Sequence, residues 1–218
     1  MSDESLFREV DEEVRQEQFK KLWARYGNLI MGLCFLVIAG VAGFQGWTYW
    51  KLKQAQAAGE TFFSAVKLQD AGKSDEALTQ FASIGHAGYA VLARLREAGT
   101  LLDQGKTADA VNIYDAIAAE ASTDGTLRDL ARIRAAAALV DTVSPADLEA
   151  RVKTFDVAGN PWRHTAREIM ASSHWRARDY TAADKAVQAI LGDPEAPASL
   201  RQRAQMLSEL LLPLLAQK

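Results

Sequence analysis

The sequence predicts an all-α protein: a single N-terminal transmembrane helix followed by a solenoid of paired helices. Two observations lead to this prediction. Residues 26–50 carry no formal charge, and the remainder of the chain repeats motifs of glycine, alanine and a bulky apolar residue at fixed spacing. The 51–218 region is long enough for one domain and too short for two ordinary ones.

The first element is the apolar stretch YGNLIMGLCFLVIAGVAGFQGWTYW, which covers residues 26–50. As an α-helix it spans roughly 37 Å, which exceeds the ~30 Å hydrocarbon core of a bilayer. Aromatic residues flank both ends, as is typical of the headgroup layers: Trp23 and Tyr26, then Trp47, Tyr49 and Trp50. The stretch is too long for a cleaved signal peptide and has no polar side for a buried helix. We therefore predict a membrane span.

Residues 1–25 are dense in charged helix-forming residues and predict a short cytoplasmic leader helix. Five basic residues precede the span, and three follow it within twenty residues. This asymmetry favours a cytoplasmic N-terminus and places residues 51–218 on the other side of the membrane. The leader is either a solvated topogenic segment or, as the alternative, a docking tail for a cytosolic partner.

Charge and cysteine content exclude several classes of protein. The net charge is −3 and no basic patch stands out, so we expect no nucleic-acid partner. The one cysteine, Cys34, lies within the apolar stretch. An intrachain disulfide and a cysteine-based metal site are therefore both impossible.

The region after the span contains a repeated motif. In GKSDEALTQF, which starts at Gly72, an alanine follows after five residues and a phenylalanine after nine; GKTADAVNIY, from Gly105, has alanine and tyrosine at these offsets. A third copy, RDYTAADKAV, starts at Arg178. Another alanine lies twelve residues before the first alanine of each copy: Ala65, Ala98 and Ala171. Small side chains let two antiparallel helices approach closely, and glycine lets the chain reverse between them.

These motifs resemble the tetratricopeptide repeat, a helix-turn-helix unit of about 34 residues whose stacked copies form a solenoid. The spacing of 33 residues between Gly72 and Gly105 favours this packing over an ordinary helical bundle. A degenerate unit fits before the third copy, with a helix over 126–141 and another starting at Ser144-Pro145. Asn160-Pro161 should start the next helix, and residues 198–216 should form the capping helix of the stack.

The sequence has no catalytic motif: we find no glycine-rich phosphate loop, no zinc-binding HExxH and no glycine-flanked serine elbow. His164 and Glu168 lie one helical turn apart, which is compatible with metal binding, but no third ligand is near and a surface contact is expected. We therefore predict no metal, no cofactor and no enzymatic activity.

The order of the segments along the chain indicates a more specific family than the repeat motif alone. The leader ends in WARYG, the span ends in GWTYW, and the chain closes with NPWRHTAREIMASSHWRARDYTAAD and PASLRQRAQMLSELL. This organisation resembles the YfgM-like ancillary subunits of the bacterial Sec translocon. The resemblance implies an inner-membrane protein with a periplasmic repeat domain. Its implied partners are the Sec translocon, secretory polypeptides and a membrane-anchored, prolyl-isomerase-like periplasmic chaperone.

The repeat register predicts where partners bind. In tetratricopeptide stacks the first helix of each pair lines the concave face, and counting from the three upstream alanines places seven residues there: Phe62, Val66, Gln69, Leu95, Leu102, Glu168 and Trp175. For Val66 and Leu102, core packing is an equally good interpretation. Trp175 is the strongest candidate, because an aromatic side chain can anchor a bound segment with little loss of entropy.

Small residues within the span form two pairs at a spacing of four, Ala39 with Gly43 and Ala42 with Gly46. This spacing predicts a close-packing stripe for another transmembrane helix. The alternative is a lipid-facing surface, because glycine is common in membrane helices generally.

Two classes of function remain open from the sequence. The first is a scaffold that binds secretory polypeptides or chaperones beside the translocon, where the tether raises its effective concentration. A periplasmic organiser of envelope assembly or cell division belongs to the same class. The second is a membrane-bound enzyme, which would require a buried polar cluster.

Overall fold

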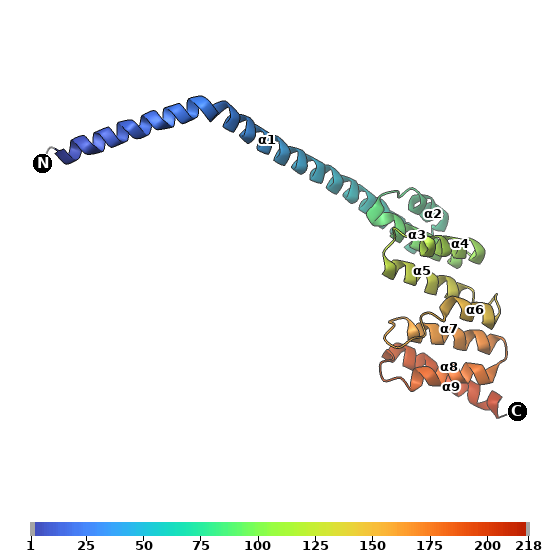
Figure 1. Ribbon diagram of the computed structural model, residues 1–218. Coiled ribbons are helices and arrows are strands. Elements are labelled where there is room, and N and C mark those ends of the chain that lie inside the picture. The colour runs from blue at the N-terminus through green and yellow to red at the C-terminus, as the bar shows by residue number, and fades with distance from the viewer. Residues whose placement is uncertain (1–2, 217–218) are drawn as a thin grey trace. The chain divides into compact units, whose positions relative to one another are not determined.

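The computed structural model describes the backbone of residues 3–216, together with the side chains of Arg15 and residues 20–216. All regular structure within residues 3–216 is helical, in nine α-helices (Figure 1). The chain divides into two compact units, Met1–Gln56 and Ala57–Lys218. The predicted all-α class is confirmed.

Helix α1, Asp3–Asp70, continues without a break from the first unit into the second. Its most apolar 18-residue window has a mean hydropathy of 2.1, and 6% of that window is buried. Phe35 and Phe44, for example, expose 72% and 73% of their surfaces. The helix is therefore long enough and apolar enough to cross a membrane once. No helix end marks the predicted boundaries at residues 25 and 50, which stay predictions.

Eight shorter helices complete the second unit: α2 (Ser74–Ala82), α3 (Ala87–Asp103), α4 (Thr107–Ala119), α5 (Gly125–Ala138), α6 (Pro145–Val152), α7 (Arg163–Arg176), α8 (Tyr180–Leu191) and α9 (Ala198–Leu215). From α2 onwards each helix packs against the next one. This is the packing expected of consecutive helix-turn-helix units. The helix predicted over 126–141 corresponds to α5, which ends earlier, at Ala138.

The predicted small positions lie where the helices cross. All six are at most 1% exposed: Ala65, Ala77, Ala98, Ala110, Ala171 and Ala183. The bulky residues four positions after the second alanine of each copy are also buried: Phe81, Tyr114 and Val187, at most 2% exposed. A methyl group at each crossing lets the backbones approach, and the larger side chain fills the space one turn later. The repeat register read from the sequence is therefore confirmed.

The turn within each repeat has the same conformation in all three copies. Gly72, Gly105 and Arg178 have φ values of 76°, 75° and 61°. The same backbone hydrogen bond closes each turn, from the next residue's N–H to the carbonyl five residues before it: Lys73 to Leu68, Lys106 to Leu101 and Asp179 to His174, each 2.9 Å. This is the helix-terminating arrangement that favours glycine, so Arg178 occupies a strained position.

Two predicted helix starts had different outcomes. Helix α6 begins at Pro145 as predicted, and the Ser144 hydroxyl accepts a hydrogen bond from the N–H of Asp147 at 3.2 Å. The prediction that α7 starts at Asn160-Pro161 is wrong, because α7 begins at Arg163. Asn160 instead accepts a hydrogen bond from the N–H of Trp162 through its side-chain oxygen, at 2.8 Å. This local turn delays the helix.

The C-terminal helix forms as predicted. Helix α9 packs along α8 and also touches α7. Leu200, Ala204 and Leu211 are at most 9% exposed on its inner side, with Leu207 and Leu215 packed against the same cluster. The helix therefore covers the last helix pair, as a terminal element of a repeat domain must.

Candidate partner-binding groove

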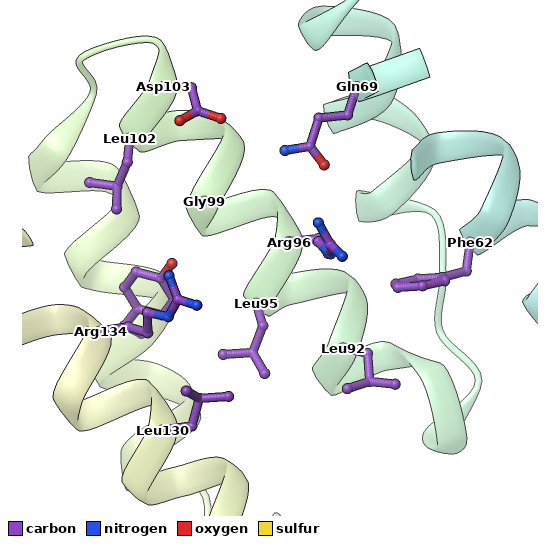
Figure 2. Close-up of a pocket in the computed structure, with 11 residues that line it drawn as sticks. Phe62, Gln69, Leu92, Leu95, Arg96, Gly99, Leu102, Asp103, Leu130 and Arg134 are labelled. Carbon is purple, nitrogen blue, oxygen red and sulfur yellow. The ribbon is translucent and has the colours of Figure 1, made fainter. Parts of the chain in front are cut away.

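A cavity of about 560 Å³ opens among helices α1, α3, α4 and α5 (Figure 2). We call it the first cavity. Its large apolar lining residues are Phe62, Leu92, Leu95, Leu102 and Leu130. Its polar lining residues are Gln69, Arg96, Asp103, Tyr114 and Arg134, and Gly99 completes the wall. The volume is in the range of pockets that enclose a small ligand or several side chains.

Helical periodicity explains why α3 supplies most of this wall. Its lining residues follow one another at spacings of three and four, from Leu92 through Leu95, Gly99 and Leu102. Gly99 leaves space in the centre of this face, since a Cβ atom there would lie 3.9 Å from the Tyr114 hydroxyl. Phe62 and Gln69 are two turns apart on α1 and face the same space.

Four of the seven predicted groove residues meet in the first cavity: Phe62, Gln69, Leu95 and Leu102. The other three lie elsewhere. Val66 packs against the N-terminal core cluster. Glu168 accepts a hydrogen bond from Arg203 at 2.9 Å. A role of these residues in partner binding stays a prediction.

Trp175 lies far along the repeat domain, on α7. Its ring is 5.6 Å from that of Tyr180 in an edge-on arrangement, and it packs against the C-terminal core cluster. Such an aromatic pair contributes to packing beyond its buried area. The contacts of this side chain are therefore those of a packing residue.

Sequence reasoning did not assign Gly99 or Tyr114 to the groove, and it missed five further lining residues: Leu92, Arg96, Asp103, Leu130 and Arg134. The first three of these five were accessible from the sequence, because they lie three or four residues from Leu95 or Gly99 on α3. Leu130 and Arg134 lie on α5, in the degenerate unit. No repeat motif there gives a register, so the sequence held no comparable signal for them.

The polar side of the first cavity includes one unsatisfied buried oxygen and one hydroxyl with a shifted pKa. The side-chain oxygen of Gln69 is buried and makes no hydrogen bond among the described residues. Burial raises the pKa of the Tyr114 hydroxyl, while Arg134 lowers it and Asp103 raises it further. The charges of Arg134 and Asp103 therefore both influence the ionisation of the Tyr114 hydroxyl.

Comparison with protein families accounts for this architecture. A family model described as a tetratricopeptide repeat-like domain matches residues 20–156, which is more than half of the 218-residue chain. The chain belongs to this family. No curated protein and no solved structure matches it. The tetratricopeptide repeat-like fold typically serves as a non-catalytic scaffold for protein-protein interactions.

The tetratricopeptide repeat-like domain has a second cavity, of about 480 Å³, among α6, α7 and α8. Its wall combines alanines and charged groups: Ala182, Ala186 and Ala189 with Lys153, Asp156, Arg167 and Lys185. The Arg167 guanidinium bonds to Asp156 at 2.6 Å and to the Ala189 carbonyl at 2.9 Å. Its charge is therefore already compensated within the wall.

Next to the second cavity, Asp193 joins the α8–α9 loop to the start of α7. Its carboxylate accepts two hydrogen bonds from Arg163, at 2.9 and 3.0 Å, and one from Arg167 at 3.3 Å. His164 Nε2 lies 3.0 Å from the same carboxylate. Arg163, with the N–H of Glu195, holds the pKa of Asp193 well below its usual range. This cluster fixes the C-terminal part of the repeat domain.

The side chains of His164 and Glu168, the candidate metal ligands, do not point towards a common site. His164 is 5% exposed and turned towards Asp193, so the expected surface contact is wrong for this residue. Glu168, its predicted neighbour, is bonded to Arg203 instead. Among the described side chains no group of three or more histidine, cysteine, aspartate or glutamate residues could hold a metal ion.

The small-residue stripe of α1 is open. Ala39, Ala42, Gly43 and Gly46 are all exposed. A Cβ atom at Gly43 or Gly46 would meet nothing within 4 Å. Their role as a contact for another transmembrane helix stays a prediction.

Proposed function

We propose that the protein is a membrane-tethered scaffold that binds segments of partner proteins in the first cavity. The observation that carries this proposal is the concave wall built from α1, α3 and α5, the first helices of successive pairs. Leu92 exposes 38% of its surface on that wall, beside half-buried Phe62 and Leu95. Apolar anchors in a concave site are the usual means of holding an extended or helical segment.

The tether is the apolar part of α1, and we place it in the bacterial inner membrane with the N-terminus in the cytoplasm. The excess of lysine and arginine before the span supports this orientation. The repeat domain is then periplasmic. Tethering confines it near the membrane and raises its effective concentration towards partners there.

The partners we propose are the Sec translocon, secretory polypeptides that leave it, and a membrane-anchored, prolyl-isomerase-like chaperone. The resemblance to the YfgM-like subunits supports this choice. In this role the groove brings a chaperone and a newly translocated chain together. The same geometry would serve an adaptor in envelope assembly or cell division, and the identity of the bound neighbours separates the two.

Replacing Leu92 with aspartate tests the groove. Partners cross-linked reversibly in intact membranes and recovered with the full chain should fall at least about tenfold, because the charge would have to be desolvated at an apolar contact. Asn112→Asp is the matched control, since Asn112 is exposed on α4 outside the cavity. Equal recovery of translocon and chaperone subunits with both variants would contradict the proposal.

Protease accessibility tests the orientation. Protease added to spheroplasts should degrade the region after Lys51, while the leader stays intact until the membrane is opened. Cleavage of the leader with protection of the repeat domain would reverse the proposed topology. Release of a soluble protein that begins near Ala58 would show that the apolar stretch is a signal peptide.

The stripe on α1 is proposed as a contact for another membrane helix. Gly43→Ile adds a bulky side chain at its centre and should weaken co-purification of translocon subunits without lowering membrane insertion. Unchanged co-purification would assign this face to lipid.

A further inference from the structure

We propose that the first cavity selects acidic segments, those in which aspartate or glutamate side chains lie next to large apolar residues. The inference rests on the proposed function, and specifies the chemistry of the segment that the groove binds. It follows from two arginine side chains of the cavity wall that form no ion pair with the described residues.

Arg96 on α3 and Arg134 on α5 both line the first cavity (Figure 2). Both side chains are exposed, and neither forms a hydrogen bond or an ion pair with the described residues. Arginines beside the cavity differ: Arg94 pairs with Glu120 at 2.8 Å and Arg132 with Asp129 at 3.0 Å. The two cavity arginines therefore keep their full donor capacity.

The remaining charge in the cavity does not neutralise this pair. Asp103 is the one carboxylate among the lining residues, and it forms no ion pair with either arginine. The wall thus has two cationic groups and one anionic group. The chain as a whole carries a net charge of −3, so a preference for acidic ligands would arise from this site and not from the overall field.

A side-chain carboxylate fits these groups in both charge and shape. A guanidinium presents parallel N–H donors that match the two oxygens of a carboxylate. The apolar wall of Phe62, Leu92 and Leu95 lies beside the arginines and takes neighbouring apolar side chains.

Peptide selection on the full chain in nanodiscs tests this inference. The probe is a displayed library of random twelve-residue peptides with amidated C-termini, so that side chains supply every carboxylate. Selected peptides should be enriched in aspartate and glutamate over asparagine and glutamine. Individual acidic binders should lose about threefold to fivefold in affinity with Arg96→Gln or Arg134→Gln, as for exposed ion pairs. Arg132→Gln, on the same helix as Arg134 but outside the cavity, should leave affinity unchanged.

The outcomes separate this inference from the proposed function. Two results overturn the acidic preference and leave the groove intact: peptides that depend on Leu92 but show no acidic enrichment, or acidic peptides that bind Arg96→Gln and Arg134→Gln as tightly as the wild type. Acidic enrichment that Arg132→Gln reduces equally also overturns it, because the attraction is then not local. If the selection yields no peptide whose binding depends on Leu92, both the acidic preference and the proposed groove are overturned.

Discussion

The first and second cavities of the repeat domain are similar in size, and their walls differ in how the arginine side chains are paired. The first, among α1, α3, α4 and α5, combines large apolar side chains with two arginines that form no ion pair with the described residues. The second, among α6, α7 and α8, is lined by alanines and charged side chains: Asp156 and Asp193 engage its one arginine, Arg167, whereas Lys153 and Lys185 form no ion pair with the described residues. The difference between the walls therefore lies in their guanidinium groups: those of Arg96 and Arg134 are available to a partner, and that of Arg167 is held by carboxylates of the protein.

The same repeat register underlies both regions. Buried alanines at the helix crossings and left-handed turns recur in the first two copies and in the third. The third copy differs at one repeated position, where arginine replaces the turn glycine, and in the loop after α8, which brings Asp193 to α7. We conclude that the repeated residues determine how the helices pack. The residues that differ between copies determine which region can bind a partner and which region is held by internal contacts.

The largest expected effect tests what the two regions share. Ala98→Leu and Ala171→Leu each insert a branched side chain where the exposed fraction is at most 1%. Each should destabilise the protein by about 3 kcal/mol, because the crossing helices must separate. Urea unfolding of the full chain in detergent, followed by tryptophan fluorescence, measures this. Ala137→Leu, at an exposed position of α5, is the control. A loss in one region alone would show that the register is not equivalent.

A second comparison separates a packing residue from a binding residue. Trp175→Ala should cost about 2 kcal/mol, because it removes a partly buried ring from the C-terminal cluster and from Tyr180. Leu92→Ala should cost less than about 0.5 kcal/mol at its exposed position. Thermal unfolding midpoints measure both. If Trp175→Ala lost partner cross-linking while its thermal unfolding midpoint stayed unchanged, the binding groove would have to be placed in the C-terminal region.

The turns provide a smaller effect of opposite sign in the two regions. Gly105→Ala places a Cβ atom at a φ of 75° and should destabilise by about 1 kcal/mol. Arg178→Gly relieves the same strain at a φ of 61° and should stabilise by up to about 1 kcal/mol, less the entropy that glycine adds to the unfolded chain. Chemical unfolding distinguishes them. Shifts of the same sign would mean that the two turns are not equivalent.

The smallest effect is a change in pH dependence. Because the folded protein lowers the pKa of Asp193 below its ordinary value of 3.8, the stabilisation is present above that pH and is lost as the pH falls below it. Unfolding free energy measured from pH 5 to pH 2 should therefore fall less steeply for Asp193→Asn than for the wild type. Parallel curves would show that the Arg163 contact does not contribute to stability.

The sequence predicted those parts of the fold that depend on local spacing. The repeated glycine and alanine offsets placed the turns at Gly72 and Gly105, and Ser144-Pro145 placed the start of α6. The start of α7 could not be predicted, because the Asn160 side chain satisfies the Trp162 N–H and delays the helix. A proline preceded by asparagine is compatible with both outcomes.

The site was predictable only where the repeat motif is intact. The register grouped Phe62, Gln69, Leu95 and Leu102, and these four residues meet in one cavity. It offered nothing for Leu130 and Arg134, because the unit that contains them has lost the motif. It also gave no sign of the Asp193 cluster, whose contacts join residues 30 positions apart through the loop that follows α8.

Site-specific photo-cross-linking from the two cavities tests the division between binding and stabilisation most directly. A photoreactive amino acid is placed at Leu92 in the first cavity and, in a separate chain, at exposed Lys185 in the second. After irradiation of intact membranes, we expect partner adducts from position 92 and few from position 185. Adducts of the same partners at equal yield from both positions, or from position 185 alone, would contradict it.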